Sequence, residues 1–222
     1  MTPDSEILTI MFIDIAGYTK KTTQLSRTQF KLMHDYFDSI SIPTFQKYFG
    51  RVIKKIGDAY LVTFKSATDA VICGIELIHS FKEFNKLKKI PQPLHIKVAL
   101  HAGEVIIRNQ DIYGDAVNTA ARIEGAAKAG QIVFSESVFS MMNKNEVNHI
   151  FLGAHKFKGV KYPVKLFRVK TKYDQYLQKK RREKILRKKK KRKITEFFKR
   201  LFAILIIFGL ISLLMWFLYN YV

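Results

Sequence analysis

The chain has 222 residues, with 39 lysine and arginine residues against 18 aspartate and glutamate residues, so its formal net charge is +21. An apolar share of 48% is enough to build a hydrophobic core, which excludes a wholly disordered chain. The single cysteine, Cys73, excludes an intramolecular disulfide framework and a cysteine-cluster zinc site, and the six histidines show no metal-ligand spacing such as HExxH.

The first elements are predicted from an apolar run and a helix-capping signal. Residues Ile7 to Ile13 are apolar and predict a strand that ends on Asp14. The sequence from Ser26 to Gln29 has the spacing of a capping box, which predicts the start of a helix. Because proline lacks a backbone N–H, we expect Pro43 to interrupt this helical region or to begin a new turn of it.

A hairpin and a second helix are predicted next. Two β-rich runs, Arg51 to Ile56 and Ala59 to Phe64, are separated only by Gly57 and Asp58, a pair typical of a tight turn. A second capping box, at residues Ser66 to Asp69, then opens an amphipathic helix that we expect to continue through Phe84.

The remaining elements complete an alternating pattern. We expect strands at Leu94 to Ala102, Glu104 to Arg108 and Gln131 to Phe134, a helix over Asp115 to Ala127, and a closing β segment near Pro163 to Val169. The order β, α, β, β, α, β with additions predicts an α+β domain with the ferredoxin-like arrangement.

The C-terminal residues form a long apolar segment. No side chain is charged from Leu201 to Val222, and about 20 apolar helical residues are enough to cross the hydrocarbon core of a bilayer. Trp216, Tyr219 and Tyr221 gather at the far end, where a membrane interface favours them. The alternative is a buried core helix, but a domain of this size would have to cover an apolar cylinder on all sides. We therefore expect a transmembrane helix over residues 201–220.

A strongly basic run precedes this segment. Fourteen basic residues and two acidic ones lie between Lys179 and Arg200. Basic flanks of a membrane span stay on the cytoplasmic side, so we expect a cytoplasmic domain over residues 1–172, a basic juxtamembrane linker over 173–200, and a C-terminal tail anchor. A nucleic-acid-binding tail is the alternative. Because the run adjoins the span, we favour anionic lipid head groups as its partner and expect no nucleic acid partner.

Two aspartates lie at the predicted ends of strands, where carboxylates can bind cations. Asp14 follows a buried strand and precedes a turn containing Gly17, and Asp58 lies at the tip of the predicted hairpin. Two carboxylates on adjacent tips of one sheet can hold a pair of Mg²⁺ ions for in-line displacement at phosphorus. Taken singly, each aspartate is better explained by a structural role, Asp14 as a helix-entry cap and Asp58 as a turn residue.

Four segments in order carry a family resemblance. They are Phe12–Gly17 (FIDIAG), Lys54–Ala59 (KKIGDA), Asp111–Arg122 (DIYGDAVNTAAR) and Phe157–Val164 (FKGVKYPV). Together they resemble the catalytic domain of the class III nucleotidyl cyclases, the family of adenylyl and guanylyl cyclases. The resemblance covers roughly residues 7 to 169.

The resemblance implies a role for each matching residue. Asp14 and Asp58 match the metal-binding aspartates, which implies two Mg²⁺ or Mn²⁺ ions per site. The substrate residues match as follows: Lys54 and Asp111 contact the base, Asn118 orients the ribose, Arg122 stabilises the reacting phosphate, and Lys158 contacts the triphosphate. In this family the aspartates come from one subunit and the other five residues from its partner, so the resemblance also implies a homodimer with two equivalent sites.

The residue types agree with an adenylate cyclase that converts ATP into 3′,5′-cyclic AMP and pyrophosphate. Asn118 and Arg122 are four residues apart and share one helix face. A lysine donor beside an aspartate acceptor suits adenine, whereas guanine presents the reverse pattern. Neighbours on a strand point to opposite faces, so either Lys54 or Lys55 enters the pocket, and the spacing from Gly57 selects Lys54. The alternatives are a guanylate cyclase and a membrane-anchored nucleotide-binding module without turnover.

Overall fold

The structure is a computed structural model that describes residues 5–18, 22–23, 25–88, 93–171, 174 and 209. The first compact unit, Met1–Lys170, contains the strands and helices named below. The expected linker over 173–200 and the expected membrane helix over 201–220 lie outside the described residues, apart from Asp174 and Gly209. Within the described part of the chain, no helix is both long enough and apolar enough to span a membrane.

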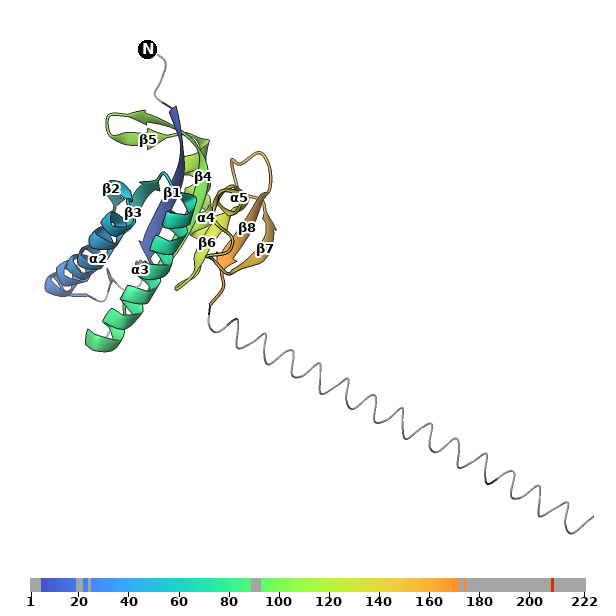
Figure 1. The fold of residues 1–222 in the computed structure, drawn as a ribbon. Helices are drawn as coiled ribbons and strands as arrows, with labels where there is room; N and C mark the ends of the chain where they lie inside the picture. Colours follow the sequence, from blue (N-terminus) through green and yellow to red (C-terminus); the bar gives the residue numbers. More distant parts are fainter. Residues whose placement is uncertain are drawn as a thin grey trace, which may run out of the picture. The chain divides into compact units, whose positions relative to one another are not determined.

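The described strands form one eight-stranded mixed sheet. In spatial order they are β2 (Arg51–Ile56), β3 (Ala59–Phe64), β1 (Ser5–Ile15), β4 (Ile96–Arg108), β6 (Ile132–Ser135), β8 (Val164–Val169) and β7 (His149–His155), with β5 (Asp111–Tyr113) paired to β4 (Figure 1). The four strands β2, β3, β1 and β4 are antiparallel to one another in this order, whereas β4 pairs with β6 in parallel. Their order is that of a ferredoxin-like βαββαβ unit, which confirms the predicted α+β fold.

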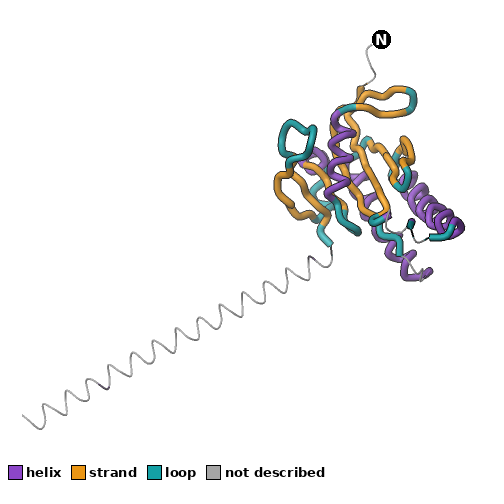
Figure 2. Tube along the Cα trace, turned by 180° about the vertical axis from the view of Figure 1, so that it is seen from behind, coloured by secondary structure: helices purple, strands orange, loops and turns teal. Residues whose placement is uncertain are grey.

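Helices cover both faces of the sheet. α2 (Arg27–Lys47) and α3 (Ala67–Lys88) lie side by side on one face, and α4 (Asp115–Ala126) packs against β4 and β1 on the other, which Figure 2 views from behind. The short α5 (Glu136–Met141) follows β6. Strand alternation separates two cores, since Met11 and Ile13 pack with α2 and α3, whereas Ile10 and Phe12 pack with α4.

α2 begins where predicted but differs in its interior. Ser26 is its N-cap, and the capping box with Gln29 is present in both directions. The helix continues through Pro43, so the expected interruption there is wrong. A helix-interior proline costs ~3 kcal/mol. The fully buried Phe37 and Phe45 on either side of it fix the helix to the core at roughly 1.5 to 3 kcal/mol each, which offsets that cost.

β4 is one continuous strand where the sequence predicts two. Gly103 lies between the two expected strands and does not end the pairing with β1. Its role is a close approach, because a Cβ atom at Gly103 would lie 2.9 Å from the Cβ of Ala116 in α4. The glycine therefore lets α4 pack directly onto the sheet. The predicted hairpin, β2 to β3, and the second predicted helix, α3, are confirmed.

Three elements are absent from the prediction, namely β5, α5 and β7. β5 has three residues and α5 has six, which are too few to show a clear period. β7 carries a register shift between Phe151 and Gly153 in its pairing with β8, and this shift breaks the alternation that marks a strand.

Candidate functional site

Asp14 lies near the end of β1 at the edge of the α4 face. In the sheet it pairs with Ala59 on β3 and with Lys97 on β4. Leu8, Ile10 and Phe12 precede it at alternating positions and are buried on the same face. The Asp14 side chain is 17% exposed, so the strand presents a largely buried carboxylate at its end.

Asp58 lies beside Asp14 because of the β2–β3 turn. Gly57 adopts a left-handed φ of 60°, which allows the chain to reverse within two residues. Asp58 directly precedes Ala59, the residue opposite Asp14. Burial and the neighbouring Asp58 carboxyl raise the pKa of Asp14, against the opposing effects of Glu124 and Lys97. The structure therefore brings the two predicted metal aspartates together.

Lys97 forms ion pairs with two carboxylates at this position. Its Nζ lies 3.0 Å from Asp14 Oδ2 and 2.5 Å from Oε1 of Glu124, near the end of α4. Burial lowers the pKa of Lys97, but Glu124 and Asp14 outweigh that effect and raise it. Burial and Asp14 raise the pKa of Glu124, although Lys97 opposes them. An excess of negative charge therefore surrounds a single ammonium group.

The donor set fits a divalent cation. Asp14 Oδ1 is buried, and no described residue donates a hydrogen bond to it. A buried carboxylate oxygen without a donor is costly, and hard cations such as Mg²⁺ and Mn²⁺ prefer oxygen ligands. Among the described residues, no cluster of three or more histidine, cysteine, aspartate or glutamate side chains is arranged to hold a metal ion. Asp14 and Asp58 would thus hold metal together with oxygens from a bound phosphate or water.

Lys54 and Asp111 form the second predicted pair. Lys54 Nζ donates to Asp111 Oδ2 over 2.6 Å, and Asp111 Oδ1 accepts from the backbone N–H of Ile112 over 2.8 Å. The hydrogen bond from Lys54 is the main cause that lowers the pKa of Asp111. Asn109 and Gln110 have left-handed φ angles and form the tight turn that places Asp111 opposite Arg108. A donor and an acceptor therefore lie side by side at the surface.

The neighbouring lysine has a different partner. Lys54 pairs with Leu61 across the hairpin and shares its face toward α4, whereas Lys55 pairs with Tyr60 on the opposite face. Lys55 Nζ donates to both oxygens of Asp38 in α2 over 2.5 and 2.8 Å, and the Tyr60 hydroxyl also donates to Asp38. The spacing argument that selects Lys54 is thus consistent with the geometry.

α4 directs its two predicted residues outward. Ala116, Ala120 and Ile123 are buried against the sheet, and this fixes the rotation of the helix. Asn118 and Arg122 are exposed, and Arg122 forms no ion pair with any described residue. A permanently charged, forked guanidinium is therefore available to a ligand.

A cavity of about 450 Å³ adjoins Asn118. It lies between α4, the start of α5 and the β7–β8 loop, and His101 and Ser135 line it together with Gly159 to Lys165. Lys158 is exposed and directly precedes the lining residues of the loop. His101 contacts Ser135 over 2.8 Å, and burial lowers its pKa to about 4. His101 is therefore neutral at pH 7 and does not supply a cation to the cavity.

The predicted site residues fall into separate groups. Among the described residues, no hydrogen bond or ion pair joins Asp14 or Asp58 to the other five, which are Lys54, Asp111, Asn118, Arg122 and Lys158. In the described part of one chain, the carboxylates and the substrate residues thus belong to separate hydrogen-bond and ion-pair networks.

Comparison with known proteins identifies the family. The profile described as "Adenylate and Guanylate cyclase catalytic domain" matches residues 2–177. The chain belongs to this family. The matched range includes all the described strands and helices of the first unit and all four sequence motifs.

Relatives of both nucleotide types resemble this cyclase domain. A putative adenylate cyclase 3 from Rhizobium meliloti is 26% identical over 71% of the chain and 27% of the relative. The adenylyl cyclase CyaB from P. aeruginosa is 25% identical, with a TM-score of 0.67 over 77% of this chain and 97% of that one. The guanylyl cyclase Cya2 is 26% identical, with a TM-score of 0.68 over 76% and 94%. The chain spans between 16% and 27% of the length of the first curated relatives.

Sequence reasoning missed Lys97 and Glu124 in the cyclase domain. A signal for Lys97 was present, because a lysine inside the apolar strand Leu94 to Ala102 requires a carboxylate nearby if it is buried. Nothing in the local sequence identifies which of the 18 acidic residues that partner is. The contact joins β4 to α4 and depends on the complete fold.

The Lys54–Asp111 pair yields a pH prediction. Replacement of Lys54 by methionine should raise the pKa of Asp111 toward its usual value, measured by NMR titration of the carboxyl carbon. Because this pKa is lowered in the folded state, the pair stabilises the fold above the unfolded value of 3.8, and the contribution disappears as the pH falls through the folded pKa. Lys55→Met is the matched control, since Lys55 contacts Asp38 and its loss should leave Asp111 unchanged. An unchanged Asp111 pKa in Lys54→Met would contradict the assignment.

Proposed function

We propose that the protein is an adenylate cyclase, which converts ATP into 3′,5′-cyclic AMP and pyrophosphate. The ribose 3′-oxygen attacks the α-phosphorus in line, the 3′-hydroxyl proton is lost, and the bond from the α-phosphorus to the bridging oxygen breaks, so that pyrophosphate leaves. The observation that carries the choice of nucleotide is the contact of Lys54 Nζ with Asp111 Oδ2 over 2.6 Å.

This pair favours adenine over guanine. Adenine offers an acceptor at N1 and a donor at its 6-amino group, which match a lysine donor and an aspartate acceptor. Guanine offers a donor at N1 and an acceptor at O6. Each mispaired polar group would cost roughly 1 to 3 kcal/mol, which corresponds to tenfold selectivity or more.

The remaining residues position the phosphates. Asp14 and Asp58 would hold divalent ions, Mg²⁺ or Mn²⁺ and two per site, and these ions would lower the pKa of the 3′-hydroxyl and neutralise the triphosphate. Arg122 is exposed and ready to stabilise charge that grows on the phosphoryl oxygens, while Asn118 would orient the ribose and Lys158 would contact the triphosphate. None of the described side chains is assigned the role of general base.

The active form we propose is a homodimer with shared sites. Two observations support it: among the described residues no hydrogen bond or ion pair joins the carboxylates to the substrate residues, and α4 directs Asn118 and Arg122 outward. Exposed apolar side chains on β1, β4 and β5 also support association with a second copy, namely Ile7 (67% exposed), Ile106 (41%) and Tyr113 (51%). Each dimer would then contain two equivalent sites related by a two-fold axis.

We also propose that residues 201–220 anchor the protein in a membrane, with the basic run on the cytoplasmic side. This part of the proposal rests on the sequence, namely the uncharged segment from Leu201 to Val222 and the adjoining 14 basic residues. The basic side chains would contact anionic lipid head groups.

The nucleotide choice is tested by product formation. The full-length chain in mild detergent with Mn²⁺ should convert ATP at least about tenfold faster than GTP at equal concentration. Asp14→Ala and Asp58→Ala should abolish product, whereas Asp35→Ala, at an exposed position of α2, should retain it. Faster conversion of GTP would favour a guanylate cyclase. No product from a folded, dimeric chain would favour a nucleotide-binding module without turnover.

The shared site is tested by mixing inactive chains. Asp58→Ala and Asn118→Ala place their lesions on opposite halves of the site, so each heterodimer keeps one intact site, and random re-association should return about one quarter of wild-type activity. Asp58→Ala mixed with Asp14→Ala is the control, because both lesions affect the metal half and every site stays defective. An inactive first mixture that contains heterodimers would contradict shared sites.

The anchor is tested by membrane fractionation. The full-length chain should stay with membranes in high salt, whereas a variant that lacks residues 201–222 should be released. Salt removes lipid head-group attraction but not an inserted helix. Release of the full-length chain by salt alone would show that the basic run, not the apolar segment, holds it.

A further inference from the structure

Lys97 lies among three carboxylates at one end of the sheet. Asp14 and Glu124 contact its ammonium group directly, and Asp58 adjoins Asp14. Only 20% of the Lys97 side chain is exposed. Three acids and one base leave a local excess of negative charge, so Lys97 neutralises the cluster only in part.

Lys97 does not satisfy every carboxylate oxygen of this cluster. Its Nζ lies 3.0 Å from Asp14 Oδ2 and 2.5 Å from Glu124 Oε1, whereas the buried Asp14 Oδ1 has no donor among the described residues. Buried carboxylate oxygens that lack donors are unfavourable. The cluster is therefore one that an additional cation would stabilise.

The two partners of Lys97 come from different elements. Asp14 lies opposite Lys97 in the pairing of β1 with β4, whereas Glu124 belongs to α4 and contacts Lys97 from the face of the sheet that α4 covers. A cation with two partners can release one of them and remain paired with the other. A free ammonium in a buried position would be far more costly.

We propose that Lys97 is a built-in counter-ion of the metal site. It holds Asp14 in position while no divalent ion is bound, and it passes to Glu124 alone when an ion binds Asp14. The inference rests on the metal role of Asp14 in the proposed function. Lys97 is thus a positioning residue that competes with the metal, and Glu124 is the residue that makes the exchange possible.

The exchange predicts opposite effects for the two partners. Lys97→Met removes the competitor, so the dissociation constant for Mn²⁺ should fall roughly tenfold, the scale of effect that a neighbouring charge has on a carboxylate. Glu124→Gln removes the alternative partner, so Lys97 stays on Asp14 and the dissociation constant should rise by a similar factor. Lys97→Arg keeps the charge and should bind Mn²⁺ like the wild type.

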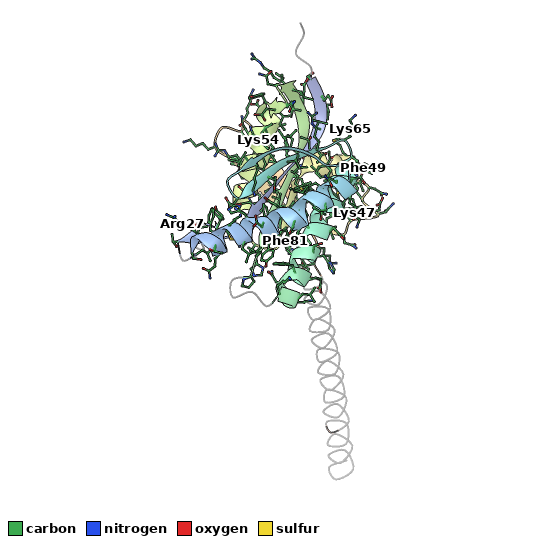
Figure 3. The ribbon with its side chains drawn as sticks, turned by 90° about the vertical axis from the view of Figure 1, so that its left-hand side faces the viewer. Arg27, Lys47, Phe49, Lys54, Lys65 and Phe81 are labelled. Carbon is green, nitrogen blue, oxygen red and sulfur yellow. The ribbon has the colours of Figure 1, made fainter. Side chains whose placement is uncertain are left out.

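The experiment measures Mn²⁺ binding without nucleotide. The full-length chain in mild detergent is titrated with Mn²⁺, and free Mn²⁺ is read by electron paramagnetic resonance. The control is Lys47→Met at the C-terminal end of α2 (Figure 3), which removes one positive charge from an exposed pair with Glu76 and should leave the dissociation constant unchanged.

A double variant separates exchange from a simple field effect. Lys97→Met combined with Glu124→Gln has the wild-type net charge. If local charge alone sets the affinity, this variant binds Mn²⁺ like the wild type. If Lys97 is exchanged between carboxylates, nothing holds Asp14 in the double variant, and Mn²⁺ binds more tightly than in the wild type.

The outcomes also distinguish this inference from the proposed function. Weaker or unchanged Mn²⁺ binding in folded Lys97→Met overturns the counter-ion role. If Lys97→Met does not fold, Lys97→Gln and the double variant provide the same test. If the variants show the predicted changes in Mn²⁺ affinity but the wild type forms no cyclic nucleotide, the proposed function is refuted and the counter-ion role stands. Absence of Mn²⁺ binding in wild type and Lys97→Met alike, in a chain that forms cyclic nucleotide, refutes the counter-ion role and leaves the function.

Discussion

The pairing of β1 between β3 and β4 is the constraint on which the rest of the domain depends. It sets which residues of β1 face α4 and which face α2 and α3, and it places Asp14 opposite both Ala59 and Lys97. A shift by one residue would turn Asp14 into the core beneath α2 and α3 and would turn Ile13 toward α4. The position of the carboxylate and the composition of the core are therefore fixed by the same register.

α4 carries this constraint to the other predicted residues. Gly103 allows the helix to approach the sheet until Ala116 is in contact, and Ile123 anchors the far end. With the rotation fixed in this way, Asn118 and Arg122 are exposed while Glu124 reaches Lys97. The same helix thus exposes two polar residues and supplies the carboxylate that pairs with Lys97.

The sequence predicts the elements whose signals are local. The capping box at Ser26 and the turn at Gly57 define their own boundaries, and the spacing of the cyclase motifs places Asp14 beside Asp58 and Lys54 beside Asp111. Of the two alternatives at Pro43, the interruption is wrong, because burial of the neighbouring side chains, a tertiary effect, outweighs the local preference of proline. The contact of Lys97 with Glu124 was missed for a related reason, since it joins elements that are distant in sequence.

The electrostatics of the Asp14 cluster oppose folding at neutral pH. The raised pKa of Asp14 means that the folded chain holds the proton more tightly than the unfolded chain does. Its charge therefore costs stability at neutral pH, and this cost is absent below pH 3.8, where the carboxyl is protonated in both states. Buried ionic clusters are commonly no more stable than apolar residues of similar size. Since Lys97 offsets only part of the charge, a cation that binds Asp14 would restore stability as well as supply chemistry.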